Sequence, residues 1–385
     1  ALSPDILKLS DCTIVLISAF PALTPCSSSE LIMASSDLKC VAIIEKDTNH
    51  DVLWTWSFPA VDSALQSLIS SKCCIKSGEN DHETIVPFLY GQHNRIWYYL
   101  LTISAKDVTS LFKVTHFTVV LVAKDFNPER YEKLGKIFQR SYMDTGSPTV
   151  LLQQYLAVLT KGSCETTGDE TFDISNYPPK KAYLSSSIKD VINVFGVETI
   201  LIYTAVLLKR KIVFYSPRIE TLLNVTRAIP QLVWHRQNWD ILFPLIDSND
   251  ETDAENLTST RYYIAGFTDA SVENRHELYD IFANISDGEV SVAPHAKETF
   301  QLGKVHKDIA MFMVNNAKDE DKNDEQLVTE LTEKTQSLIN NLRGLAVANE
   351  DNTRQVIKLE KLRERKLTSA MENFLYNLAA AEGMV

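Results

Sequence analysis

The stretch GVETILIYTAVLLKRKIVFYSP, residues 196–217, decides the fold of this chain. From Val197 to Leu208 almost every residue is apolar, and a helix that is apolar on all sides is buried on all sides. Glu198 lies in the first turn of this predicted helix and Lys209–Lys211 at or just past its end, which is the charge order that a helix dipole favours. The β-branched and aromatic run Ile212–Tyr215 follows at once and predicts a buried strand.

The segments around this stretch alternate between helix and strand. A short amphipathic helix, Ser187–Phe195, precedes it, and a longer helix is predicted from Ile219 to about His235. Two further strand-like runs follow, Ile241–Ile246 and Tyr262–Phe267. Such alternation predicts an α/β lobe in which helices pack on a sheet. The acidic segment between these two runs, Asp247–Thr260, is predicted to be a surface loop.

A hairpin and a helical region complete the C-terminal half. The turn Ser286-Asp287-Gly288 joins two short strand-like runs, and everything beyond Pro294 is helical in pattern. The predicted hairpin strands are Tyr279–Ile285 and Glu289–Ala293, and the predicted helices are about His295–Asn316, Glu325–Leu342 and Asn352–Ala381.

The N-terminal half has a different order: two strands, a helix, three strands and two helices. Asn127-Pro128 and Ser147-Pro148 each supply an N-cap residue followed by proline at the first helical position. This order predicts a compact α+β lobe with a five-stranded antiparallel sheet. Its predicted strands are Val41–Glu45, Val52–Phe58, Ile85–Tyr90, Arg95–Ile103 and His116–Lys124, and its predicted helices are Val61–Ser71, one from Asn127 to about Met143, and Thr149–Lys161.

The predicted fold class is therefore α/β with an α+β N-terminal lobe, and a polar linker with Gly162 and Pro178-Pro179 separates the two halves. The predicted boundaries are an extension at 1–36, the N-terminal lobe at 37–161, the linker at 162–180, the central α/β lobe at 181–293 and the helical region at 294–385.

Length, charge and cysteine usage narrow the class of protein. The chain has 385 residues, enough for two or three domains with real cores. Its formal net charge of −12 argues against a nucleic-acid partner and against broad adsorption to anionic lipid, because both need a basic face. The cysteines have no ligand-like spacing and are interpreted as reduced thiols of a cytoplasmic protein. They are Cys12, Cys26, Cys40, Cys73, Cys74 and Cys164.

The first 36 residues fit no regular pattern. Cys12–Phe20 is apolar enough to resemble the h-region of a signal peptide, but Lys8 is the only basic residue before it. An extra strand or an extension is the favoured interpretation. No run reaches the roughly 18 apolar residues that a membrane helix needs, so no transmembrane segment is expected.

Motifs for chemical catalysis are missing from the sequence. There is no GxxxxGK[ST], no GxGxxG after a strand, no GxSxG and no HExxH. The histidines are isolated, and no pair of carboxylates can be singled out as acid and base. No catalytic, cofactor-binding or metal-binding residue is therefore assigned, and an ordinary chemical enzyme is the weaker hypothesis.

The central stretch and its neighbours resemble the DENN-domain family. The resemblance rests on the buried helix, KRKIVFYSP, the helix ending in LVWHR, the strand ILFPLI and then RYYIAGF. The N-terminal lobe resembles the longin-type lobe that precedes this module in the family. One small single-module member is closer still, through the strings IEKDTNHDVLW, KVTHFTVVLVAKDFNPE, AVLTKG, KAYLSSSIKD, VWHRQNW, AGFTD and ENFLYNLAAAE. The likeness runs from about Ser36 to the C-terminus, and the first 36 residues and the long acidic segment depart from it.

The resemblance implies a guanine-nucleotide exchange factor for a Rab GTPase. In DENN modules the Rab sits against both lobes, and nucleotide is released when a switch segment is prised away, without acid–base chemistry. The resemblance also implies a cytoplasmic protein that associates peripherally with late endosomes or multivesicular bodies. Its implied role is in endosomal and secretory vesicle traffic. The family has no invariant catalytic triplet, so no catalytic residue is carried over.

The alternative is a non-catalytic adaptor. The small family member is associated with a coiled-coil endosomal recycling assembly, the Commander complex with its retriever part, so the resemblance implies coiled-coil subunits as partners. Trp54, Trp56 and Phe58 alternate along one predicted strand and would face one side of the sheet. If helices cover that side, the three are core residues. If it is open, they form an apolar patch typical of a partner site, and they are the partner-binding candidates.

A third hypothesis assigns the contact to the C-terminal helices. Their apolar side chains would dock on a partner, although helices at domain ends usually pack on their own core. A short basic cluster among them predicts a solvated face or a weak contact with acidic membrane. The apolar residues are Leu359, Leu362, Leu367, Phe374, Leu375 and Leu378, and the basic ones are Lys361, Arg363, Arg365 and Lys366.

Overall fold

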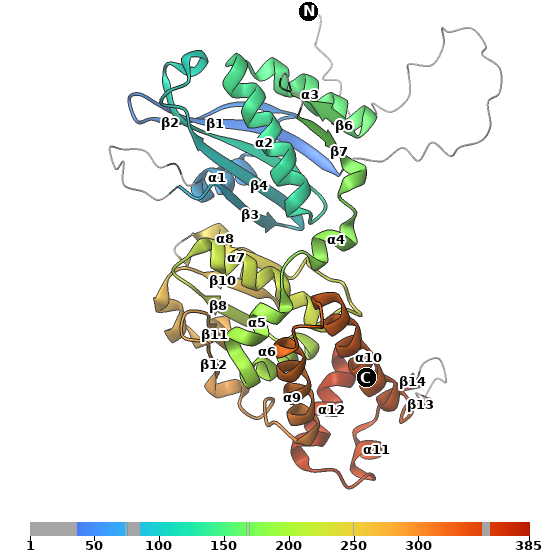
Figure 1. Ribbon diagram of the computed structural model, residues 1–385. Coiled ribbons are helices and arrows are strands. Elements are labelled where there is room, and N and C mark those ends of the chain that lie inside the picture. The colour runs from blue at the N-terminus through green and yellow to red at the C-terminus, as the bar shows by residue number, and fades with distance from the viewer. Residues whose placement is uncertain are drawn as a thin grey trace, which may run out of the picture. The chain divides into compact units, whose positions relative to one another are not determined.

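The computed structural model describes residues 37–73, 75, 85–166, 168, 170–248, 250–348 and 355–385 (Figure 1). The predicted extension at 1–36, with its apolar run, lies outside the described residues, as do Cys12, Cys26 and Cys74. Residues 36–385 belong to one compact unit. Within it we call residues 37–161 the N-lobe, 181–293 the C-lobe and 294–385 the helical region.

The N-lobe contains the predicted five-stranded antiparallel sheet, with strand order β2-β1-β5-β4-β3. The central strands β1 and β5 are buried on both faces, since Ile43, Ile44, Val119 and Val120 are each at most 1% exposed. This explains why both strands are nearly continuous apolar runs in the sequence. The bounds are β1 Leu38–Asp47, β2 Val52–Phe58, β3 Phe88–His93, β4 Ile96–Ser104 and β5 Val114–Ala123.

Three helices cover this sheet, and their starts follow from local capping. The side chains of Asp62, Asn127 and Ser147 each accept a hydrogen bond from a backbone N–H of the first turn. Gly146 ends the second helix with a φ of 63°, the left-handed conformation that glycine adopts without strain. The helices are α1 Ser63–Lys72, α2 Pro128–Thr145 and α3 Pro148–Lys161.

The segment predicted as a polar linker has secondary structure of its own. A small hairpin packs against α2 and α3, and a short helix starts at the second proline of Pro178-Pro179. Gly162 has a φ of 74° and ends α3 as predicted for a boundary glycine. The elements are β6 Ser163–Glu165, β7 Thr171–Asp173 and α4 Pro179–Leu184.

The C-lobe is an α/β layer built on a mixed sheet with strand order β12-β11-β8-β10-β9, so the predicted fold class is confirmed. Strands β9, β10, β8 and β11 are parallel, and β12 is an antiparallel edge. The strands are β8 Ile212–Tyr215, β9 Leu242–Ile246, β10 Ile264–Phe267, β11 Ile281–Asn284 and β12 Glu289–Val292. The helices are α5 Ile188–Phe195, α6 Thr199–Leu207 and α7 Ile219–Ala228.

The predicted central helix, α6, is buried as expected. Every residue of α6 except Leu201 is buried, and Ile202, Ala205 and Leu207 are fully inaccessible. A 3₁₀ turn at Gly196–Glu198 precedes it, and the 3₁₀ helix Ile229–Val233 extends α7. Further 3₁₀ turns are Thr109–Leu111, Ile174–Asn176, Ala270–Asn274, His276–Leu278 and Pro294–Ala296.

Three predictions for the C-terminal half were wrong. The helix predicted from about His295 begins only at Lys304, after a 3₁₀ turn at Pro294–Ala296 and an irregular segment. The acidic segment forms helix α8, Glu251–Thr258, in place of a surface loop, because Asp253 on it is buried against the N-lobe. The single helix predicted over Asn352–Ala381 is divided by a break around Thr368, whose side chain caps a new helix. The elements of the helical region are α9 Lys304–Lys318, α10 Asp324–Arg343, β13 Val347–Ala348, β14 Gln355–Val356, α11 Leu359–Arg363 and α12 Ser369–Ala381.

One helical run among the described residues, Pro179–Leu207, has the length and hydropathy of a membrane span, a property that no segment was expected to have. Its most apolar window is 61% buried inside the protein. The run consists of α4, α5 and α6, with interruptions at Ser185–Ser187 and at Gly196. Its apolar character is accounted for by the core of the C-lobe that it forms.

The last helix, α12, is held to the C-lobe through Glu382. The carboxylate accepts hydrogen bonds from Arg236 and from His235 Nε2, the latter at 3.3 Å. Arg236 also donates to the carbonyl oxygens of Val206 and Leu207 at the end of α6. Burial acts to raise the pKa of Glu382, but the hydrogen bonds and charges of His235 and Arg236 outweigh it and lower the pKa to about 2.

We expect the Glu382 contact to stabilise the protein only above acidic pH. A carboxyl group whose pKa is depressed in the folded state contributes stability above its ordinary pKa and loses it as the pH falls toward the depressed value. Glu382→Gln should therefore lower the free energy of unfolding by about 1–3 kcal/mol at neutral pH. The difference from the native protein should shrink between about pH 5 and pH 2 in urea titrations. Glu298→Gln, at an exposed site, is the control, and a pH-independent difference would contradict the assignment.

Candidate functional site

The N-lobe and the C-lobe meet along strand β3, where buried side chains bond to backbone carbonyls of the other lobe. The Tyr90 hydroxyl donates to the Leu223 carbonyl at 3.2 Å. Gln92 Nε2 donates to the carbonyls of Asp240 and Leu242 at 2.7 and 2.8 Å. Tyr90 and Gln92 are 2% and 5% exposed, so these bonds are shielded from water. They fix the position of β3 against the segment that leads into β9.

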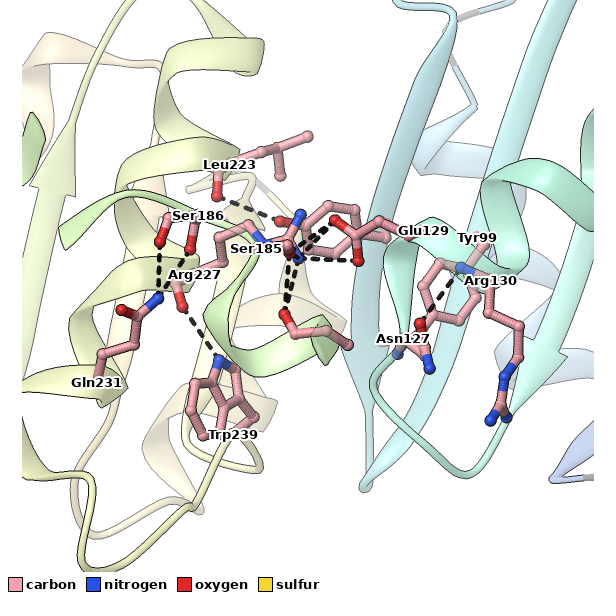
Figure 2. A network of polar contacts seen from close by, with 12 residues as sticks. Tyr99, Asn127, Glu129, Arg130, Ser185, Ser186, Leu223, Arg227, Gln231 and Trp239 are labelled. Carbon is pink, nitrogen blue, oxygen red and sulfur yellow. Dashed lines mark hydrogen bonds and ion pairs between the residues drawn. The ribbon is translucent and has the colours of Figure 1, made fainter. Parts of the chain in front are cut away.

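Arg227 on α7 links both lobes to the segment between them (Figure 2). Its Nη2 lies 2.9 Å from a carboxylate oxygen of Glu129 in the first turn of α2, and donates to the Ala182 carbonyl at 3.0 Å. Ser185 accepts from the same nitrogen and donates to Glu129 at 2.8 Å. Because Arg227 is buried and Glu129 is partly exposed, this ion pair is a directional contact in a shielded site.

Aromatic rings fill the space beside Arg227. Trp239 of the C-lobe stacks on Tyr183 of α4 with centroids 4.1 Å apart, and on Phe126 of the N-lobe at 6.2 Å. The indole N–H of Trp239 donates to the Arg227 carbonyl at 3.0 Å, as Figure 2 shows. The Arg227 guanidinium lies 5.6 Å from the centroid of the Phe126 ring. The N-lobe, α4 and the C-lobe thus share one aromatic cluster, which we call the junction cluster.

A buried ion pair joins the lobes at a second place. Lys72 at the end of α1 pairs with Asp253 of α8, and both side chains are only 4% exposed. Asp253 also accepts from the backbone N–H of Asp247 at 2.7 Å. Burial raises the pKa of Asp253, and the Lys72 ammonium acts in the opposite direction. Sequence reasoning missed this pair, since its members lie 181 positions apart and nothing local marks either of them.

A cavity of about 380 Å³ also lies where the lobes meet. Its walls include Gln92 and Arg95 of the N-lobe together with Asp240, Phe243 and Tyr262 of the C-lobe. The mixture of amides, carboxylate, guanidinium and aromatic rings suits recognition of a polar surface. It contains no nucleophile paired with a base.

Within the described part of the chain, no group of three or more His, Cys, Asp or Glu side chains could hold a metal ion. The described thiols of Cys40, Cys73 and Cys164 are buried and unbridged. Burial raises the pKa of Cys40 and of Cys164 to about 12 in each case. Both thiols are therefore protonated at neutral pH and are poor nucleophiles.

The three aromatic candidates on β2 do not share one face of the sheet. Trp56 pairs with Ile43 and Trp54 with the adjacent Ile44, so a bulge with Thr55 as its extra residue interrupts the alternation. Adjacent residues of β1 point to opposite faces, and Trp54 therefore lies on the face opposite to Trp56 and Phe58. The prediction that Trp54, Trp56 and Phe58 all face one side of the sheet is corrected by this bulge.

The burial of these candidates is intermediate. Trp54 and Trp56 are partly buried against the hydrophobic core, whereas Phe58 is 37% exposed and contacts Tyr155 of α3 edge-on at 5.7 Å. Leu53, which sequence reasoning did not single out, is 54% exposed on the same strand. Strand β2 is the outermost strand of its sheet, and among the described residues no strand pairs with its outer edge.

The C-terminal helices turn their main apolar side chains inward. Leu362, Phe374 and Leu378 are at most 2% exposed, and Leu375 packs partly buried against the core. In the basic cluster, Lys361 pairs with Glu364 at 2.8 Å and Arg363 with Glu372 at 3.1 Å. Packing on their own core, not docking on a partner, accounts for these helices.

Comparison with known proteins agrees with this architecture. Residues 185–294 match the family described as SPA, stabilization of polarity axis. The chain is 42% identical over 346 residues to human DENN domain-containing protein 10, covering 90% of this chain and 96% of the human protein. The zebrafish (Danio rerio) protein of the same name is 43% identical over 355 residues, covering 92% of this chain and 99% of its own. The Dictyostelium discoideum protein of that name is 37% identical over 359 residues, covering 89% and 97%.

These likenesses extend across both lobes and the helical region. The resemblance to the DENN-domain family is thereby confirmed. The chain belongs to the DENN domain-containing protein 10 family.

Removing one partner of the buried interlobe ion pair should destabilise the protein strongly. Asp253→Asn leaves the Lys72 ammonium buried without a counter-charge, a change that costs about 3–5 kcal/mol. The matched control is Glu325→Gln, which breaks the exposed pair with Lys180, and we expect it to cost less than about 1 kcal/mol. Guanidinium denaturation of both variants measures the difference. A loss below about 1 kcal/mol for Asp253→Asn would show that this pair is hydrated in solution.

Proposed function

We propose that this protein is a guanine-nucleotide exchange factor of DENN type for a Rab GTPase of late endosomal or secretory vesicle traffic. The observation that carries the proposal is the junction between the lobes, where buried hydrogen bonds, the Arg227 network and the Lys72–Asp253 pair hold two α/β surfaces together. Membership of the DENN family supplies the class of partner.

Exchange by this route needs binding energy and no chemical step. The protein would bind the nucleotide-free GTPase more tightly than the loaded one, and this difference in affinity lowers the barrier to nucleotide release. A preference of about 10⁴-fold corresponds to roughly 5.5 kcal/mol. A surface has this preference for the nucleotide-free GTPase only if it is too rigid to adapt its shape to the nucleotide-bound GTPase as well. The fixed junction provides that rigidity, and in this proposal the protein regulates a GTPase without catalysing chemistry itself.

A second candidate function rests on strand β2. An outermost strand with Leu53 and Phe58 exposed offers both a backbone edge and apolar side chains to a partner. In this alternative the protein is an adaptor that binds coiled-coil subunits of an endosomal recycling assembly of Commander or retriever type. Trp54, Trp56 and Phe58 would then belong to or border the contact. In either role we propose a cytoplasmic protein that meets late endosomes peripherally, without a transmembrane segment or a nucleic-acid partner.

The exchange proposal predicts faster release of fluorescent GDP from one purified Rab, in proportion to the concentration of this protein. Late-endosomal and secretory Rabs are tested first. Arg227→Gln removes a charge-assisted contact worth about 1.5–3 kcal/mol and loosens the junction. It should lower the acceleration by about tenfold or more. Arg275→Gln, which breaks an exposed pair with Glu277, should leave the acceleration unchanged.

The outcome that contradicts this proposal is a flat response across the panel from protein shown to be folded. The adaptor function would then lead. If Arg227→Gln and Arg275→Gln lower the acceleration equally, exchange does not depend on the junction. The protein would still be shown to be an exchange factor.

The adaptor alternative predicts that Trp56→Asp weakens capture of purified coiled-coil subunits. For an interface tryptophan, binding falls by about 2 kcal/mol or more while stability changes by no more than about 0.5–1 kcal/mol. A core tryptophan would instead lose about 3–5 kcal/mol of stability. Because Trp56 is half-buried, Leu53→Asp at the exposed site gives a cleaner test, with the exposed Leu302→Asp of the helical region as its control. Normal capture by Leu53→Asp together with a large drop in the melting temperature of Trp56→Asp would rule this contact out.

A further inference from the structure

A cationic pocket lies where α6 ends and β8 begins, away from the junction cluster. Its volume is about 430 Å³, within the range of small-ligand sites. The turn between α6 and β8 contributes Lys209, Arg210 and Lys211, and Arg261 comes from the segment before β10. Helix α12 closes the pocket with Asn377. Four cationic side chains thus gather in one hollow of a chain whose net charge is −12.

Three cations of this pocket form no ion pair with a carboxylate of the described residues. Among the described residues, no ion pair includes Lys209, Lys211 or Arg261. The two ammonium groups lie over the rings of Tyr262 and Tyr263 at 5.9 and 5.7 Å.

The two acidic residues in the wall of the pocket have partners other than the side chains of Lys209, Lys211 and Arg261. Glu277 pairs with Arg275 at 3.0 Å, and Asp280 accepts from His295 at 3.3 Å and from the Lys211 backbone N–H at 2.9 Å. The four cations of the pocket thus outnumber the two carboxylates in its walls.

Arg210 adds an unsatisfied donor. Its Nη2 donates to Asn377 Oδ1 at 2.8 Å, which fixes the guanidinium against α12. Its Nε is buried and has no hydrogen-bond partner within the described residues. The guanidinium of Arg210 is thus held by α12, and the remaining cations of the pocket are Lys209, Lys211 and Arg261.

Helix capping does not explain these side chains. Basic residues after a helix commonly neutralise its last carbonyls, but at α6 Arg236 already donates to the carbonyls of Val206 and Leu207. The backbone of Lys209 closes α6 in a left-handed conformation with a φ of 52°, and the Arg210 N–H donates to the Ala205 carbonyl at 2.9 Å. Burial, followed by the positive charge of Arg236, holds the pKa of Lys209 below its ordinary value. The Glu382 carboxylate acts in the opposite direction without outweighing them, and an anion in the pocket would further stabilise the charged ammonium.

We propose that this pocket binds a small ligand bearing two or more phosphate groups, held by Lys209, Lys211 and Arg261. Phosphate suits the site because ammonium groups bind it as point charges and a guanidinium fork binds it through paired hydrogen bonds. Walls from five separate segments favour a compact ligand over an extended acidic chain. A soluble inositol polyphosphate and the headgroup of a phosphorylated phosphatidylinositol share this chemistry.

The test measures binding of inositol hexakisphosphate to the full chain by calorimetry, and sedimentation with phosphatidylcholine vesicles that contain or lack a phosphatidylinositol bisphosphate. The double variant Lys209→Asn and Lys211→Gln should weaken binding by at least about tenfold, since two charges are lost. Asparagine is chosen at 209 because it tolerates the left-handed conformation. Arg261→Gln, at an exposed site, should weaken binding without affecting folding.

The control is the double variant Arg365→Gln and Lys366→Asn, which removes the same charge from the exposed basic cluster and again places asparagine at a positive φ. We expect its affinity to stay within about twofold of the native value. Binding of the soluble probe alone supports a free ligand as the source, and binding of both probes supports the lipid. Absence of binding to either probe, equal losses from both double variants, or equal affinity for polyglutamate would overturn the proposal.

Discussion

The complete burial of α6 is the constraint on which the rest of this structure depends. A helix with no polar face must be covered on every side, and here β8, β11 and β12, the 3₁₀ helix Ile229–Val233, α5 and α9 cover it. Two of its polar side chains form hydrogen bonds inside this shell. Thr204 donates back to the Ile200 carbonyl at 2.7 Å, and the Tyr203 hydroxyl meets Thr335 of α10 at 2.8 Å. The helical region is therefore part of the core of the C-lobe, because without α9 and α10 one side of α6 would face water.

Polar contacts, more than apolar burial, determine how the two lobes are placed against each other at the junction. Apolar burial is non-directional, so it would tolerate several relative positions of the two sheets. The side chains of Tyr90, Gln92 and Arg227 instead reach single carbonyl or carboxylate oxygens, and each bond is lost if the lobes rotate. The Lys72–Asp253 pair adds little net stability, since desolvation offsets most of the Coulomb attraction. Its effect is to penalise every arrangement that separates the two charges. Polar contacts thus select one arrangement from those that the hydrophobic effect permits.

The sequence predicted the elements well wherever the signal was local. The apolar run at α6, the Asn127-Pro128 and Ser147-Pro148 starts and the strands of both sheets came out close to their observed bounds, because capping and periodicity act over a few residues. It failed where distant segments decide the outcome. Helix α8 exists in its place because Asp253 meets Lys72, and the bulge at Thr55, which separates Trp54 from Trp56, leaves no mark in an alternating pattern. The junction and the cationic pocket both consist of residues far apart in the chain, and single-sequence reasoning has no access to such pairs.

The net charge of the protein and the cationic pocket act on an anionic partner with opposite sign and over different distances. A net charge of −12 repels anionic partners at long range, and salt weakens this repulsion beyond about 8–10 Å. At shorter range a pocket lined by four cationic side chains and two carboxylates presents the opposite sign. An anionic surface would thus be attracted over one small area and repelled elsewhere, which restricts the orientation of approach far more than a uniformly basic face does. The cationic pocket and the junction belong to one compact unit, and Arg261 and Tyr262 line both the pocket and the cavity where the lobes meet. Fixing the orientation of the pocket therefore fixes the direction in which both lobes face.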